Sequence, residues 1–131
     1  MTKMQRTPPG PAVSPETEAF WEAANESRLL LRRCLDTGKA YFPPHERSPF
    51  TGSANTEWFD ASGEATLYAH SVLVRTDVPY CLAYVTLTEG PIILSNICTD
   101  DFDQLEIGQP LEVVFVDSTT GQKVPAFAPV E

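Results

Sequence analysis

Two similar pentapeptides, separated by nine residues, constrain this chain more than any other feature. The first is Cys-Leu-Asp-Thr-Gly at residues 34–38, and the second is Ser-Pro-Phe-Thr-Gly at residues 48–52. Each ends in Thr-Gly, and glycine supplies the positive backbone φ that a tight turn often needs. The two segments are therefore predicted to form matching turns joined by residues 39–47.

Matching turns of this kind resemble the two knuckles of a rubredoxin-type zinc ribbon. In that motif, Cys-x2-Cys-Gly repeats place four thiolates around one tetrahedral ion. The corresponding positions here are Cys34, Thr37, Ser48 and Thr51. Neutral hydroxyls are poor zinc ligands, and one thiolate cannot hold the ion against water. The pattern predicts a degenerate, metal-free ribbon, although two unrelated turns explain these residues equally well when they are taken alone.

The charge of the chain is unevenly divided. Residues 1–63 contain seven Lys and Arg against eight Asp and Glu, whereas residues 64–131 contain two against ten. Binding to nucleic acid depends on Lys and Arg that neutralise phosphates, so no nucleic-acid partner is expected. The basic residues near the pentapeptides form either a solvated face or a surface for an anionic group such as the phosphates of a nucleotide-like carrier. They are Arg28, Arg32, Arg33, Lys39 and Arg47.

The sequence predicts a cytoplasmic protein without a membrane partner. No apolar run approaches the length that crosses a bilayer, and residues 1–11 lack the apolar core of a signal peptide. The three cysteines are odd in number and widely spaced, which favours reduced thiols. Cys81 and Cys98 are expected to be small buried residues at the ends of strands.

The N-terminal part is predicted to be a flexible arm followed by one helix. Residues 1–13 are rich in proline and lack periodicity. Ser14 as N-cap and Pro15 at the first helical position predict a helix that extends to about Ser27. Its aromatic pair, Phe20 and Trp21, would be costly to expose and must pack either on the core of the chain or on a partner.

An aromatic and proline-rich segment lies between the two pentapeptides. Tyr41, Phe42, Pro43 and Pro44 cannot form a helix, and we expect an exposed ridge or a lid over the ribbon. After Gly52 the chain runs through Trp58 and Phe59 to Ser62-Gly63, which is taken as the linker into the second region. The candidate surface for a partner or ligand comprises Phe20, Trp21, Arg32, Arg33, Tyr41, Phe42, Pro43 and Pro44.

Residues 64–131 have the pattern of an OB-fold barrel. Strands are predicted at residues 65–76, 82–88, 91–98, 111–116 and 123–127, with turns at Glu89-Gly90 and at residues 119–121. A short helix, capped by Thr99 or Asp100, is expected before residue 106. Three strands, a helix and two strands is the order of the five-stranded OB-fold. The fold class is mainly β: a flexible arm (1–13), a helix with a degenerate ribbon (14–63) and the barrel (64–131).

With these parts in this order, the sequence resembles the acyl-CoA-associated zinc-ribbon OB-fold proteins, a family long catalogued as a domain of unknown function. The resemblance implies an accessory subunit beside a thiolase-like enzyme, where it contributes to assembly or to the acyl-CoA site. The family ribbon has four cysteines and this chain has one, so zinc is not carried over. The matching residues are Phe20-Trp21, 29–34, Gly38, Phe42-Pro43-Pro44, Gly52, Trp58, Ser62-Gly63, 89–91, Ile107-Gly108, Pro110 and 124–129.

If the ribbon fold remains without zinc, other side chains must hold it together. Tyr41, Phe42 and Trp58 are expected to pack over the space that the ion would fill. The hydroxyls of Thr37, Ser48 and Thr51 are expected to bond the backbone of the knuckles.

The sequence contains no motif of a stand-alone catalyst. It has no G-x-S-x-G elbow, no phosphate-binding G-x-x-x-x-G-K and no H-E-x-x-H. His45 and His70 lack ligand-like neighbours, and nothing local supports Cys81 as a nucleophile with His70 as its base. Three functions remain: a non-catalytic accessory subunit, an independent protein that binds CoA, acyl-CoA or a small ligand, and an oligonucleotide-binding module that the acidic charge opposes. Whether the subunit also forms a homo-oligomer is left open.

Overall fold

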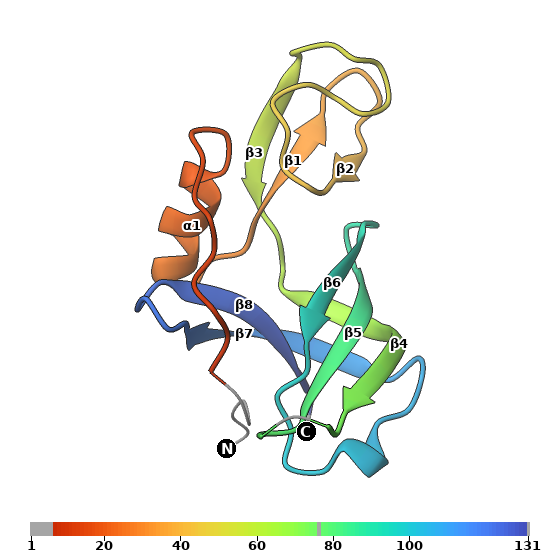
Figure 1. Cartoon of the computed structure of the whole chain (residues 1–131). Helices are drawn as coiled ribbons and strands as arrows, with labels where there is room; N and C mark the ends of the chain where they lie inside the picture. The colour runs from red at the N-terminus through yellow and green to blue at the C-terminus, as the bar shows by residue number, and fades with distance from the viewer. Residues whose placement is uncertain (1–6, 76, 131) are drawn as a thin grey trace.

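The computed structural model describes residues 7–75 and 77–130. The first six residues of the predicted arm, and Thr76 at the end of the first predicted barrel strand, lie outside the described residues. The described part contains one helix, one 3-10 turn and eight strands, and the strands form two antiparallel sheets (Figure 1). The fold is therefore mainly β, as predicted. None of the described helices is long and apolar enough to cross a membrane.

The end of the arm lies against the sheet. The carbonyl of Pro8 accepts a hydrogen bond from the N–H of Thr119 at 2.9 Å, and the N–H of Gly10 donates to the Thr119 hydroxyl at 3.1 Å. Residues 7–13 have no regular secondary structure. These two bonds hold this part of the arm beside the turn between the last two strands.

The helix α1 (Glu18–Asn25) begins later than the sequence predicts. Ser14 does not cap it, because the backbone N–H of Ser14 bonds the Thr17 hydroxyl at 3.0 Å and closes a separate turn. Thr17 is the N-cap residue, without a side-chain bond to the helix. Phe20, on the inner face of α1, is buried in the core of the chain itself.

The first sheet has the order β2-β1-β3, with β1 (Leu30–Cys34) between β2 (Ala40–Tyr41) and β3 (Thr56–Asp60). The sequence did not predict β3, in which Trp58 lies directly opposite Arg32, ahead of the predicted linker at Ser62-Gly63. The aromatic pair of β3 makes cation-π contacts with the two arginines of β1. The Arg32 guanidinium lies 4.8 Å from the Trp58 ring, and that of Arg33 lies 4.0 Å from the Phe59 ring.

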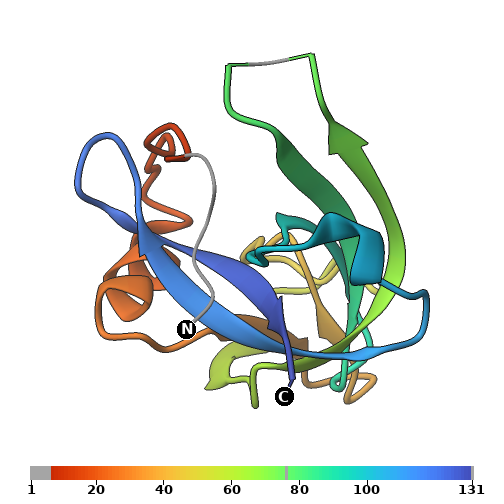
Figure 2. The same ribbon diagram turned by 90° about the horizontal axis from the view of Figure 1, so that it is seen from below.

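The second sheet has the order β6-β5-β4-β7-β8, with antiparallel neighbours. Its strands are β4 (Glu64–Leu73), β5 (Tyr80–Leu87), β6 (Ile92–Asn96), β7 (Pro110–Asp117) and β8 (Lys123–Pro129). A β-bulge between Leu67 and Ala69 bends β4, and Figure 2 shows the curl of the sheet from below. A parallel bridge from Ile97 to Phe127 brings the two edges together. The result is the predicted OB-fold topology.

The predicted short helix is a 3-10 turn, η1 (Phe102–Gln104). Its cap is Asp101, whose carboxylate accepts the N–H of Asp103 at 3.0 Å. The prediction of Thr99 or Asp100 as the cap was wrong, because the Thr99 hydroxyl accepts instead from the N–H of Asp101 at 3.3 Å. The cap lies one or two residues further along the chain.

One hydrophobic core joins both sheets and the helix. It contains Phe20 from α1, Leu31 from β1, and Leu67 and Phe127 from the second sheet. The ribbon is therefore packed on the OB-fold domain through apolar side chains. Cys81 and Cys98 are buried free thiols, as predicted.

Candidate functional site

The two pentapeptides form turns with the same backbone geometry, and we call them the first knuckle (34–38) and the second knuckle (48–52). The N–H of Gly38 donates to the carbonyl of Cys34 at 2.7 Å, and that of Gly52 donates to the carbonyl of Ser48 at 2.8 Å. The two glycines have φ values of 75° and 76°. The prediction of matching turns is confirmed.

The hydroxyl groups at the degenerate positions bond the backbone of their own knuckles, as expected. Ser48 Oγ accepts from the N–H of Phe50 at 3.0 Å and from the N–H of Thr51 at 3.3 Å. Thr51 Oγ1 accepts the N–H of Ser53, and Thr37 Oγ1 accepts the N–H of Lys39, both at 3.3 Å. These bonds repeat from one knuckle to the other.

The Cys34 thiol lies at the centre of this arrangement. Hydrogen bonds from the side chains of Ser48 and Thr37, together with backbone N–H groups in the first knuckle, lower its pKa from 9.0 to about 7. Burial of the sulfur opposes this shift but does not outweigh it. The hydroxyl groups that stand where a zinc ribbon has thiolates therefore stabilise the one remaining thiolate.

Asp36 links the two knuckles, and sequence reasoning did not single it out. Its carboxylate accepts hydrogen bonds from Ser53 Oγ at 2.7 Å, Asn55 Nδ2 at 2.9 Å and Thr51 Oγ1 at 3.1 Å. These bonds lower the pKa of Asp36 below its usual value. The signal was an acidic residue in the first knuckle and a run of short polar side chains just after the second.

The ribbon residues do not fit a zinc ion. Of the four knuckle positions, only Cys34 supplies a thiolate, and the hydroxyls of Thr37 and Ser48 are engaged in hydrogen bonds to it. Among residues 7–75 and 77–130, no group of three or more His, Cys, Asp or Glu side chains is placed to hold a metal. Side-chain hydrogen bonds cross-link these knuckles in the way that a metal cross-links a zinc ribbon.

The three aromatic residues expected over the ribbon have different neighbours. The ring of Tyr41 meets Phe50 of the second knuckle edge-on at 6.2 Å, and its hydroxyl donates to the carbonyl of His45 at 2.5 Å. Phe42 instead packs on Phe20, with ring centroids 5.6 Å apart. Trp58 lies under Arg32 in the three-stranded sheet. Of these three rings, only Tyr41 is in ring contact with a knuckle residue.

An apolar groove of about 460 Å³ brings together five residues of the candidate surface. It lies between α1, the segment after β2, and strands β6 and β8, and Leu94 and Pro125 form its opposite wall. The indole N–H of Trp21 is buried without a hydrogen-bond partner. The expectation of an exposed ridge was wrong for two of the four residues 41–44, because Tyr41 and Pro44 are buried, whereas Pro43 is exposed. The five residues are Phe20, Trp21, Phe42, Pro43 and Pro44.

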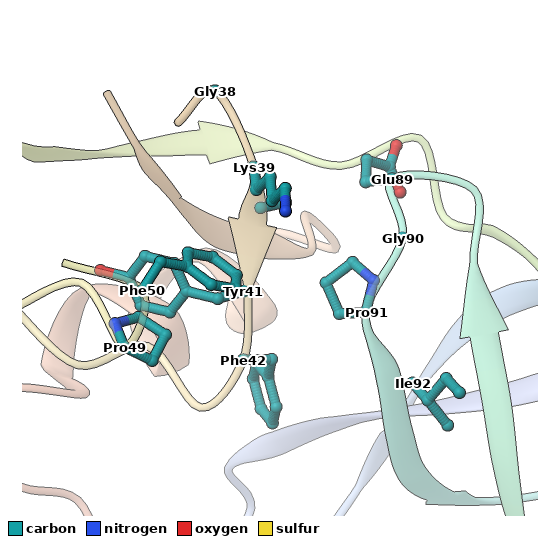
Figure 3. Close-up of a pocket in the computed structure, with 11 residues that line it drawn as sticks. Gly38, Lys39, Tyr41, Phe42, Pro49, Phe50, Glu89, Gly90, Pro91 and Ile92 are labelled. Atoms are coloured by element: carbon teal, nitrogen blue, oxygen red, sulfur yellow. The ribbon is translucent and has the colours of Figure 1, made fainter. Parts of the chain in front are cut away.

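A second cavity, the ribbon cleft, separates the ribbon from the turn between β5 and β6 and has a volume of about 570 Å³ (Figure 3). Tyr41, Phe50 and Lys39 line its ribbon side, whereas Glu89 and Ile92 line the other. One oxygen of Glu89 accepts the N–H of Ser62 at 2.9 Å, and Oε1 is buried without a partner. The cleft therefore combines aromatic walls with one cation and one carboxylate.

Two of the five residues of the predicted basic surface form ion pairs with carboxylates. Arg28 bonds Glu26 and Asp60, each at 2.8 Å, and Arg33 lies 3.6 Å from Glu57. Arg32 and Arg33 border neither the groove nor the cleft. Lys39 lies over the Phe50 ring at 5.5 Å and is the basic residue that lines the ribbon cleft. The structure thus divides the candidate surface into an apolar groove, a cleft with Lys39, and an Arg pair stacked on β3.

A rubredoxin-like ribbon joined to an OB-fold domain is also what comparison with known proteins finds. Residues 21–47 match the model of the ChsH2 rubredoxin-like zinc ribbon domain, and residues 58–116 match that of the ChsH2 C-terminal OB-fold domain. A DUF35 domain-containing scaffold protein of Methanothermobacter thermautotrophicus is 33% identical over 108 residues, which cover 76% of this chain and 81% of that protein. The chain belongs to the DUF35 family, and the resemblance seen in the sequence is confirmed.

Two further relatives are subunits or parts of complexes. A probable enoyl-CoA hydratase alpha subunit of Thermomonospora curvata is 29% identical over 126 residues, which cover 92% of this chain. The chain spans only 40% of the length of that relative. The solved structure of an Ltp2-ChsH2(DUF35) aldolase contains a chain with a TM-score of 0.80 and 28% identity, covering 92% of this chain and 98% of that one.

Proposed function

We propose that this chain is a non-catalytic accessory subunit of an enzyme that acts on an acyl-CoA. The observation that carries the proposal is the match to the Ltp2-ChsH2(DUF35) aldolase, which extends over 92% of this chain with a TM-score of 0.80. Relatives named as a scaffold protein and as a CoA hydratase subunit support the same role. The finer expectation, a thiolase-like partner, follows from the family resemblance.

The chemistry of the chain supports an accessory role. Burial raises the pKa of the Cys81 thiol, and its sulfur hydrogen-bonds the carbonyl of Leu82 at 3.6 Å rather than an imidazole. Cys34 has the lowered pKa of a reactive thiol, but it is fully buried and its named partners are hydroxyls and backbone amides. No pairing of a nucleophile with a base is therefore seen at either thiol.

The proposal includes a ribbon that folds without zinc. The bond that Asp36 accepts from Thr51 and the bond between the side chains of Ser48 and Cys34 cross-link the knuckles, and the shared core holds the ribbon sheet on the OB-fold domain. A partner bound at the groove would add to this stabilisation. The ribbon would then serve as a structural element of the subunit.

The test is affinity purification of the tagged full chain from its own cells, with mass spectrometry and metal analysis of the eluate. We expect a stoichiometric acyl-CoA enzyme and no zinc bound to this chain. Recovery of the chain alone would contradict the accessory role. Stoichiometric zinc on the purified chain would contradict the metal-free ribbon and leave the accessory role standing.

A second function, direct binding of CoA, is favoured by the ribbon cleft. Its volume of about 570 Å³ and its Lys39 beside Phe50 offer room and one positive charge for an acidic ligand with an aromatic base. Calorimetric titration of the isolated chain with CoA tests this function. Binding that is weakened by Lys39→Ala, but not by Arg47→Ala, would favour it over a purely structural role.

A further inference from the structure

Three neighbouring strands of the OB-fold domain carry almost no charge. Residues 65–74, 78–88 and 91–99 contain no Asp, Glu, Lys or Arg, although residues 64–131 contain ten acidic residues in all. These segments include nearly all of β4, β5 and β6, which are adjacent in the sheet (Figure 1). The absence of charge therefore extends over a continuous surface.

The outer face of these strands is exposed and apolar. In β5, residues 81, 83, 85 and 87 are buried, so that Tyr84 points away from the core and is 49% exposed. Leu94 of β6 is paired directly with Tyr84 and is 57% exposed. Tyr68 at the bulge of β4 and Ile92 of β6 are exposed as well. We call these four residues the Tyr84 patch.

An antiparallel sheet that faces water normally carries polar side chains on its outer face. A contiguous uncharged surface with exposed tyrosines has instead the composition of an interface centre, where aromatic residues are enriched and charges are depleted. We propose that the Tyr84 patch docks this chain on its partner, a protein whose matching surface is apolar at the centre and basic at the rim. The inference rests on the proposed function and assigns a surface to it.

Charge argues for this occupant over a second copy of the chain. Residues 64–131 carry ten acidic and two basic side chains, and Glu64 and Glu89 lie at the borders of the patch. Two copies facing each other would bring like charges together, whereas a basic rim would be attracted. In other OB-folds, the face of the second and third strands of the domain binds oligonucleotides. Here these strands are β5 and β6, and they offer no Lys or Arg for phosphates.

The patch is continuous with the groove and the cleft. Leu94 lines the apolar groove together with Trp21 and Pro43, and Ile92 lines the ribbon cleft. A partner seated on the patch would therefore also reach the aromatic and proline residues of the helix and ribbon. This continuity makes the candidate surface and the sheet face parts of one interface.

The experiment measures the affinity of the full chain for the acyl-CoA enzyme that co-purifies with it. Tyr84→Asp and Leu94→Asp place a charge on the patch, and Ile107→Asp is the control because Ile107 is 63% exposed and outside the patch. Tyr84→Asp and Leu94→Asp should each weaken binding about tenfold or more, and the control should not. The association rate of the native chain should fall as salt rises.

The failures can be told apart. If all three variants bind the enzyme as tightly as the native chain does, and each has a native thermal melting curve, the docking role of the Tyr84 patch is overturned and the accessory role stands. If the native chain binds no acyl-CoA enzyme, the proposed function fails, and this inference fails with it. If the native chain is a homodimer and Tyr84→Asp dissociates it, the patch binds a second copy and not a different protein. If the chain binds single-stranded DNA tightly, the charge argument against nucleic acid is overturned.

Discussion

The ribbon and the OB-fold sheet are stabilised and charged in opposite ways. Side-chain hydrogen bonds connect the knuckles, through Asp36 in particular, and charged residues such as Arg33 and Glu57 face each other across its strands. In the OB-fold domain, strands β4 to β6 are nearly free of charge, and their buried side chains, Leu67 among them, share one core with Phe127 of β8. The difference teaches how polar side-chain bonds can connect the knuckles of a ribbon whose sheet is anchored on a neighbouring core.

Restoring the thiolates should have the largest effect on this comparison. Because both knuckles keep the same turn, the combined substitution Thr37→Cys, Ser48→Cys and Thr51→Cys should rebuild a tetrahedral site. Zinc binding contributes on the order of 10 kcal/mol to folding in small zinc peptides. We expect one zinc per chain by native mass spectrometry, with none in the unmodified chain. A variant without zinc would mean that the knuckles are too far apart.

Removing the side chain at the centre of the shared core should have the next largest effect. Phe127 is fully buried, so Phe127→Ala should lower the free energy of unfolding by about 3–5 kcal/mol in denaturant titrations. Since the ribbon packs on the same core, both halves should unfold together. Leu94→Ala is the matched control, because Leu94 is exposed and its truncation should have little effect. Separate transitions for the two halves would contradict the shared core.

Asp36→Ala should loosen the ribbon and leave the OB-fold sheet intact. The variant loses three hydrogen bonds between the first knuckle and residues 51–55, so amide exchange should accelerate at residues 48–55 and remain slow in β4 to β8. The pKa of Asp36 is lowered in the fold, so its contribution is present above the usual value of 3.8 and is lost as pH falls through the lower one. The difference from the unmodified chain should therefore shrink at acidic pH.

The smallest expected effect is the titration of Cys34. The pKa of Cys34 is lowered from 9.0 to about 7. The hydrogen-bonded Cys34 thiolate therefore makes its full contribution to the free energy of unfolding above pH 9, and this contribution is lost as pH falls through 7. Absorbance at 240 nm should show one thiolate that forms near pH 7, because burial raises the pKa of Cys81 and raises that of Cys98 to about 11. Cys34→Ser should remove this step. Its persistence in that variant would contradict the assignment.

The sequence predicted features that depend on local patterns. Two Thr-Gly turns predicted the knuckles, and the order of strands predicted the OB-fold. It did not predict β3, whose aromatic residues face arginines about 26 residues away in the chain. Asp36 was missed for the same reason, because its partners lie 15 to 19 residues further along. The Tyr84 patch was not recognised, because apolar residues occur on both faces of β4, β5 and β6 and obscure which face is buried.

The most direct test of the accessory role is reconstitution of acyl-CoA turnover from purified components. The enzyme that co-purifies with this chain is separated from it and assayed alone, with the native chain added back, and with Leu94→Asp added back. The account predicts that the native chain restores turnover, that the chain alone has none, and that the variant restores less at equal concentration. Full turnover by the enzyme without this chain, or turnover by the chain alone, would contradict the account.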